Sequence, residues 1–202
     1  MMPNIRWEGN QTWEKDYPEV VIPDHAVKIE SRGGSLDGSL QYGILPMLFC
    51  FACLFLKAKI FGDFPLDKPY ALAGIALGLC LLPIHELLHA VCCPPESEVY
   101  CGISIRKFAA FCVCHYPMTR RRFIVMSLLP AVLGLIPLIL FLAFPVSWKI
   151  PSAICWPAAM IGLLSPMPDY KDVHNVLRQV TPSAMIQSCN HGWFWFEQNA
   201  NH

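Results

Sequence analysis

Long apolar runs alternate with polar segments along this chain, and this alternation is the main guide to its fold. The runs cover residues 39–61, 69–93, 123–144 and 150–167. Each approaches the ~20 residues that a helix needs to cross the hydrocarbon core of a bilayer. The sequence therefore predicts about four transmembrane helices.

Charged residues and prolines interrupt this pattern. Lys57 and Lys59 fall in the first run, where we expect their side chains to snorkel toward the interface at one end of the helix. Proline lacks a backbone N–H and clashes with the preceding helical turn, so it kinks or ends a helix. We expect this effect in the third and fourth runs, at Pro130, Pro137, Pro166 and Pro168.

The polar segments complete the predicted organisation. We interpret residues 1–38 as a soluble N-terminal arm, residues 39–180 as a membrane-embedded domain and residues 181–202 as a C-terminal tail. β-Branched residues at 99–105, followed by the stretch 110–115, predict a small β-hairpin, although a membrane-surface loop without fixed pairing is the alternative. The expected fold class is an all-α polytopic membrane protein with one small hairpin between its second and third helices.

Composition and charge support this class. Hydrophobic residues make up 54% of the 202 residues and charged residues only 15%, and 15 basic residues balance 15 acidic ones. The absence of net positive charge argues against a nucleic-acid partner, so we expect the bilayer and a membrane protein or peptide substrate as partners. Most Lys and Arg residues lie in the arm, in the loop between the second and third runs, and in the tail, which predicts cytoplasmic termini.

Ten cysteines do not predict a disulfide framework. Six of them lie in or beside apolar runs, where cysteine behaves as a small hydrophobic residue. Cys101, Cys112, Cys114 and His115 would lie together if the hairpin forms, and a structural zinc site is conceivable there. Their spacing fits no standard zinc knuckle, and we interpret them as small residues in a reducing cytoplasm.

The motif His85-Glu86-Leu87-Leu88-His89 lies in the last third of the second run. Residues four apart share one face of a helix, so His85 and His89 can both bind one metal ion, with Glu86 beside them as a general base. The alternative is a pair of core histidines that hydrogen-bond to other side chains. A zinc site is the stronger interpretation, because ionisable residues rarely persist in a membrane helix without a partner.

A catalytic zinc ion usually has three protein ligands. The predicted topology brings the end of the fourth run to the depth of the motif, and we expect Asp172 to be the third ligand. Asp169 lies three residues earlier and would share its helix face, so it is the alternative ligand. Asn175, one turn after Asp172, could support that ligand or bind the substrate backbone. An interfacial carboxylate paired with a nearby Lys or Arg is the other interpretation of these aspartates.

These motifs resemble the family of small four-span membrane proteins described as putative zincin peptidases, which are distantly similar to the site-2 proteases. The matching pieces are the 85–89 motif, His115-Tyr116-Pro117 with Arg120–Arg122, Leu129-Pro130, and residues 172–176. The resemblance implies a zincin-like membrane domain, bound Zn²⁺ and an aspartate ligand at position 172. One departure is that the Leu-Asp-Gly of site-2 proteases is absent, since the chain has Pro168-Asp169-Tyr170.

The expected function is that of a zinc-dependent metalloprotease that hydrolyses peptide bonds within or at the membrane. The alternative is a zinc-binding membrane protein without proteolysis, such as a scaffold or a metal-handling protein. Glu86 distinguishes the two, because a purely structural zinc site has no use for an adjacent base.

Overall fold

The chain forms two units, each built from segments that lie far apart in the sequence. The computed structural model describes residues 2–11, 17–18, 20–31, 38–62, 66–107, 109–145 and 147–197; parts of the predicted arm and the end of the predicted tail lie outside these ranges. The mixed unit consists of Met1–Gly34, Pro83–Leu129 and Asp169–His202. The helical unit consists of Ser35–Leu82 and Pro130–Pro168.

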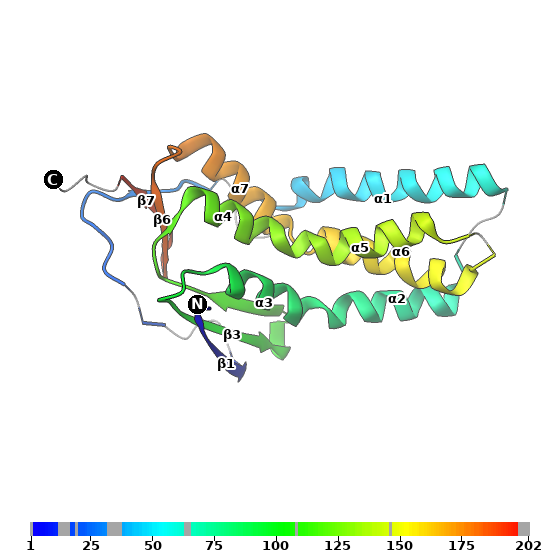
Figure 1. The fold of residues 1–202 in the computed structure, drawn as a ribbon, viewed down its shortest axis with the longest axis horizontal. Helices are drawn as coiled ribbons and strands as arrows, with labels where there is room; N and C mark the ends of the chain where they lie inside the picture. The colour runs from blue at the N-terminus through cyan, green and yellow to red at the C-terminus, as the bar shows by residue number, and fades with distance from the viewer. Residues whose placement is uncertain are drawn as a thin grey trace. The chain divides into compact units, whose positions relative to one another are not determined.

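The helical unit is built from helices (Figure 1). These are α1 (Leu40–Phe61), α2 (Lys68–Cys80), α5 (Val132–Ala143) and α6 (Lys149–Leu164). Helices α5 and α6 approach closely where two glycines face each other, since a Cβ atom on Gly162 would lie 2.6 Å from the Cα of Gly134. Small residues of this kind let helix backbones pack tightly inside a membrane.

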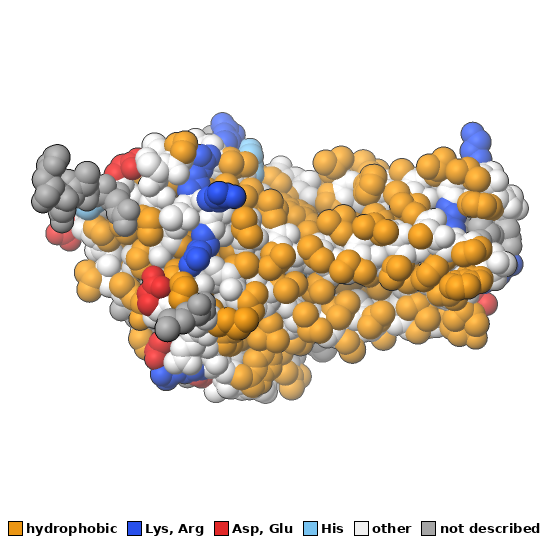
Figure 2. Space-filling model, in the orientation of Figure 1, with side chains coloured by type: hydrophobic (Ala, Val, Ile, Leu, Met, Phe, Trp, Pro, Cys, Tyr) orange, Lys and Arg blue, Asp and Glu red, His pale blue; other side chains and the backbone are white. Residues whose placement is uncertain are grey.

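The outer surface of these helices is apolar. Figure 2 shows hydrophobic side chains covering them, and Leu45, Leu72 and Ile139 are each more than 60% exposed. Water-soluble proteins rarely expose apolar patches of more than a few hundred Å². Lipid around these helices accounts for the exposed apolar side chains, since they then do not face water.

Four helical stretches in the described residues are long and apolar enough to cross a membrane, which confirms the predicted number. They are Leu40–Phe61, Lys68–Cys92, Arg120–Ala143 and Lys149–Gln179. The last three are interrupted near prolines, at Leu81, at the 3-10 turn η2 (Leu129–Ala131) and at Ser165. The fourth stretch extends beyond the predicted end at residue 167, because a new helix starts directly after the break.

Lys57 does not snorkel as we expected. Its side chain is 3% exposed, and its Nζ donates to the carbonyls of Phe141 and Phe144, the latter at 2.9 Å, where α5 ends. The last carbonyls of a helix have no partner within the helix, so the buried ammonium caps them. Lys59, two residues later, is exposed.

Two small sheets in the mixed unit show that the chain is not all-α. One has the order β1-β3-β4 and contains β1 (Asn4–Asn10), β3 (Glu98–Ser104) and β4 (Ala109–Val113). The antiparallel pair β3–β4, joined by the 3-10 turn η1 (Ile105–Lys107), is the predicted hairpin, which is thus confirmed. The predicted class is confirmed in its four long apolar helices and wrong in its single hairpin, because β1 from the N-terminal arm adds to β3 in parallel and a second sheet is present.

The second sheet joins residues from both ends of the chain. Its order is β2-β7-β6-β5, with β2 (Val27–Lys28), β7 (Gly192–Phe196), β6 (Met185–Cys189) and β5 (Met118–Thr119). These strands are two to five residues long and rely on pairing across the chain, so no local pattern signals them.

Three helices complete the mixed unit: α3 (Leu82–Cys92), α4 (Arg120–Leu128) and α7 (Met167–Gln179). The Thr119 hydroxyl caps α4 by accepting from the backbone N–H of Arg122. Fully buried side chains from α4, α7, β5 and β6 form the core, including Phe123, Val176, Met118 and Ile186. This core holds α3, α4 and α7 in place around the residues described next.

Candidate metal centre

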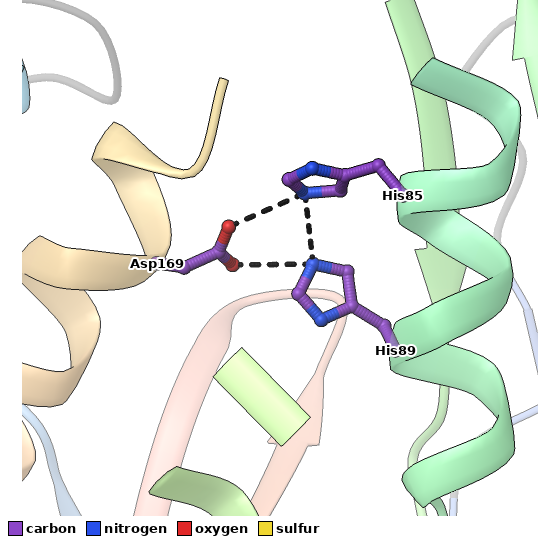
Figure 3. Close-up of side chains that lie close together, drawn as sticks. All are labelled: His85, His89 and Asp169. Atoms are coloured by element: carbon purple, nitrogen blue, oxygen red, sulfur yellow. Dashed lines mark hydrogen bonds and ion pairs between the residues drawn. The ribbon is translucent and has the colours of Figure 1, made fainter. Parts of the chain in front are cut away.

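Helix α3 presents both histidines of the motif on its buried face. His85 is 5% exposed and His89 is 8% exposed, whereas the side chains of Ile84 and Val91, on the other side of the helix, are exposed. Pro83 has no N–H to give and therefore lies in the first turn of the helix, where that donor is not needed. The Nε2 atoms of the two histidines lie 3.1 Å apart (Figure 3).

Asp169 reaches these two nitrogens from α7. It lies in the first turn of that helix, directly after Pro168. Its Oδ2 is 3.4 Å from His85 Nε2, and its Oδ1 is 3.4 Å from His89 Nε2 (Figure 3). One donor atom from each residue lies within 4.8 Å of the other two, a grouping that one ion can bridge.

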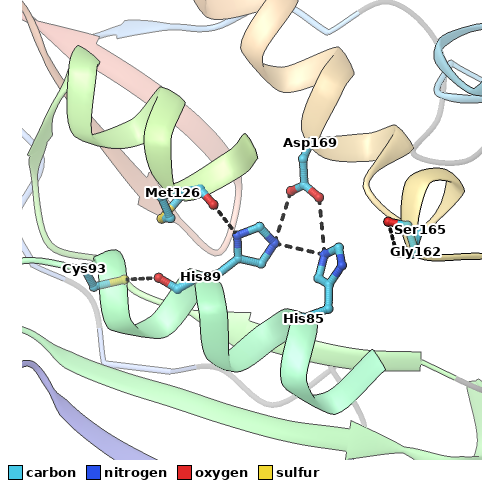
Figure 4. A network of polar contacts seen from close by, with 7 residues as sticks. All are labelled: His85, His89, Cys93, Met126, Gly162, Ser165 and Asp169. Carbon is cyan, nitrogen blue, oxygen red and sulfur yellow. Dashed lines mark hydrogen bonds and ion pairs between the residues drawn. The ribbon is translucent and has the colours of Figure 1, made fainter. Parts of the chain in front are cut away.

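A main-chain contact fixes the tautomer of His89. Its Nδ1 donates to the carbonyl of Met126 in α4 at 2.9 Å (Figure 4). In the neutral ring the proton is then on Nδ1, and the lone pair of Nε2 points toward His85 and Asp169. Histidines that bind metals almost always donate the other ring N–H in this way.

This donor set suits Zn²⁺. Two imidazole nitrogens and one carboxylate are a common ligand set of catalytic zinc, and three protein ligands leave one coordination position open. Glu86 is only partly buried on the same helix and is close enough to interact electrostatically with His85, His89 and Asp169. The group can therefore hold a metal ion and place a carboxylate base beside it.

The carboxylate that lies beside the two histidines is that of Asp169, which the sequence offered as the alternative ligand, and not that of Asp172. Asp172 lies about one turn further along α7, where its carboxylate accepts a hydrogen bond from Trp193 of β7. Asn175 follows after another turn, and its Nδ2 is buried without a hydrogen-bond partner. The break at Pro166 and Pro168 starts α7 early enough for its first turn to face the histidines.

Sequence reasoning missed the role of Met126, because any residue type can supply a main-chain carbonyl. A signal was nevertheless present, since Pro130 lies four residues after Met126. An α-helical carbonyl normally accepts from the N–H four residues later, and proline has none.

A family model described as putative zincin peptidase matches residues 78–185. The matched region includes the whole of α3, with Glu86, and the whole of α7, with Asp169. Comparison with curated proteins and with solved structures finds no match.

Proposed function

The chain belongs to the putative zincin peptidase family, and on that premise we propose that it is a zinc-dependent peptidase embedded in a membrane. The observation that carries the proposal is the convergence of His85, His89 and Asp169 beside Glu86. A closed structural site would have four protein ligands and no adjacent base.

His85 and His89 would bind the ion through Nε2, and Asp169 through its carboxylate. Bound there, Zn²⁺ supplies a Lewis acid that polarises a peptide carbonyl and makes water acidic enough to ionise near neutral pH. The carbonyl of Met126 holds the His89 ring in the orientation that this binding needs.

Glu86 performs the proton transfers. Its carboxylate accepts a proton from the attacking water as the water oxygen bonds to the peptide carbonyl carbon. The same carboxyl then donates that proton to the amide nitrogen as the C–N bond breaks, so the leaving group departs as a neutral amine. One side chain thus serves as base and acid in turn, and it ends the cycle in its starting state.

The location of these residues supports a substrate within or close to the bilayer. Both histidines lie in the candidate span Lys68–Cys92, and Asp169 lies in the candidate span Lys149–Gln179. A helical substrate keeps its carbonyls in internal hydrogen bonds, so the segment to be cut must unwind locally. We therefore propose cleavage of membrane proteins or membrane-bound peptides, comparable to that by site-2 proteases.

Glu86→Gln tests this proposal. The amide keeps the shape of the side chain but cannot accept a proton at neutral pH, so zinc content should stay near that of the wild type. Cleavage should fall by roughly 10²–10⁴-fold, the contribution typical of general acid–base groups. The assay uses purified protein in liposomes with a set of single-span peptides, and zinc is measured on the same samples. Glu96→Gln, in the exposed turn after α3, is the matched control.

The two possible contrary outcomes have different meanings. Unchanged cleavage by Glu86→Gln would exclude this proton-transfer mechanism. Loss of zinc together with cleavage would show that Glu86 is a ligand or a support of the site, and would favour a zinc-binding membrane protein without proteolysis.

A further inference from the structure

A pocket of about 430 Å³ lies between the end of α3 and the start of α4. This volume is within the range of about 300–1,000 Å³ that is typical of pockets for small ligands. Both helices belong to the mixed unit. The pocket lies where the candidate span Lys68–Cys92 ends and the candidate span Arg120–Ala143 begins, so we expect it at the level of the lipid headgroups.

One wall of this pocket is positively charged. Arg121 and Arg122 line it, and both side chains are exposed. Among the described residues neither arginine forms an ion pair, and the described lining residues include no Asp or Glu. Thr119, which caps α4, also lines the pocket, so the positive end of the helix dipole adds to the charge of the two guanidinium groups. Guanidinium groups bind phosphate oxygens through paired hydrogen bonds, so this wall suits a phosphate.

Another wall of the pocket is apolar. Val91 of α3 and Val125 of α4 line it, and their side chains are 45% and 52% exposed. Val125 lies three residues after Arg122 and four after Arg121, so it shares their helix face one turn further into the candidate span. Charge at the start of the span is thus followed by apolar surface inside it. A phospholipid has the same order of groups, with a phosphate followed by acyl chains, whereas a soluble phosphate has no apolar part to fill this wall.

We propose that this pocket binds the headgroup of an anionic phospholipid. The phosphate binds to the guanidinium groups of Arg121 and Arg122, and the first part of an acyl chain lies against Val91 and Val125. Basic pockets between transmembrane helices on the cytoplasmic side of a membrane bind anionic headgroups in this way. The distribution of Lys and Arg predicts that these ends of the two spans face the cytoplasm, where the leaflet carries negative charge.

A lipid in this pocket contacts the two helices that orient His89. In α3, Val91 follows His89 by two residues. In α4, Val125 directly precedes Met126, whose carbonyl accepts from the His89 ring. The lipid therefore holds together the same two helices that this hydrogen bond joins. None of the candidate metal ligands lines the pocket, so lipid binding requires neither bound zinc nor peptidase activity.

Native mass spectrometry of the full-length protein in a mild detergent tests this site. We expect the wild type to retain a single phosphatidylglycerol molecule per chain, and to bind phosphatidylcholine with the same acyl chains much more weakly. Arg122→Gln removes one guanidinium from the pocket and should lower the affinity for phosphatidylglycerol roughly tenfold or more, as expected for hydrogen bonds to a charged group. Arg178→Gln is the matched control, because it removes the same charge from an exposed position at the end of α7, outside the pocket. It should leave that affinity unchanged.

Three outcomes would overturn the proposal. An equal loss of affinity in Arg122→Gln and Arg178→Gln would show only a diffuse attraction between basic residues and anionic lipid. Equal retention of phosphatidylglycerol and phosphatidylcholine by the wild type would show that the arginines do not recognise the headgroup charge. Glycerol phosphate should bind far more weakly than the lipid, because it has no acyl chain, and equally tight binding would mean that the pocket takes a soluble phosphate. The wild-type measurements decide the matter even if Arg122→Gln does not fold.

Discussion

Pro130 leaves the carbonyl of Met126 without its helical donor, and that carbonyl accepts the Nδ1–H of His89 at 2.9 Å. In an uninterrupted helix the N–H of residue 130 would donate to this carbonyl. The irregular turn η2, where α4 ends, therefore contributes to the candidate metal site, because it leaves a main-chain acceptor in α4 free for His89.

Replacing Pro130 by alanine should weaken metal binding although Pro130 is not one of the candidate ligands. The new N–H competes with His89 for the Met126 carbonyl, so the imidazole loses its fixed orientation. Loss of a partner that orients a ligand typically costs 10–100-fold in metal affinity, and we expect a fall of roughly that size. Competition with a zinc indicator measures it.

Pro137→Ala is the matched control, since Pro137 lies inside α5. It should leave zinc affinity unchanged. Equal affinity of the wild type and Pro130→Ala would mean that the contact with Met126 does not orient His89.

Asp169→Asn should remove most of the zinc, whereas Asp172→Asn should retain it. Asparagine at position 169 loses the charge that faces both histidines. Asparagine at position 172 still offers an oxygen to Trp193. The fall in zinc affinity caused by Asp169→Asn should exceed the roughly 10–100-fold fall expected when a partner that orients a ligand is removed. Metal analysis of both purified variants decides between the two aspartates. If Asp172→Asn lost its zinc and Asp169→Asn kept it, Asp172 would be the ligand.

Lys57→Met should destabilise the protein, and Lys59→Met should not. Methionine fills a similar volume but leaves the carbonyls of Phe141 and Phe144 without a donor. Hydrogen bonds to a charged group contribute about 1.5–3 kcal/mol, so we expect a loss of ~2 kcal/mol. That corresponds to a midpoint roughly 4–8 °C lower for a chain of this size, measured by thermal unfolding in detergent. Equal midpoints for both variants would show that Lys57 is solvated.

Membrane topology is a further prediction. Four spans place both termini on one side, and the distribution of Lys and Arg predicts that this side is the cytoplasm. Reporter fusions after His202 and next to Asp67 should report opposite sides, with the C-terminal fusion cytoplasmic. A translocated C-terminal reporter would mean that one of the four stretches does not cross.

The sequence predicted the features that depend on local patterns. Runs of apolar residues were sufficient for the four helical stretches, and the i, i+4 spacing was sufficient to bring His85 and His89 together. The hairpin β3–β4 followed from its β-branched residues, because its strands are close in the chain.

Features that depend on distant parts of the chain were not predictable in this way. Strand β1 pairs with β3 across more than ninety residues, for example Asn4 with Glu98. Neither segment contains a sequence pattern that identifies the strand with which it pairs. The choice between Asp169 and Asp172 depended on where α7 starts, and the ends of helices are the least certain part of any prediction from sequence. Lys57 looked like an interfacial lysine because its acceptors lie 84 and 87 residues later.

The second sheet imposes an order on biosynthesis. Strand β2 is made early, but its partner β7 leaves the ribosome only after all four candidate spans. At 5–20 residues per second this delay is on the order of ten seconds. Asp169 is also made late, so a nascent chain carries His85 and His89 before the third residue of the candidate metal site. Under the proposed function, zinc binding would therefore be among the last steps of assembly, and cleavage of neighbouring proteins would begin only after Asp169 has been made.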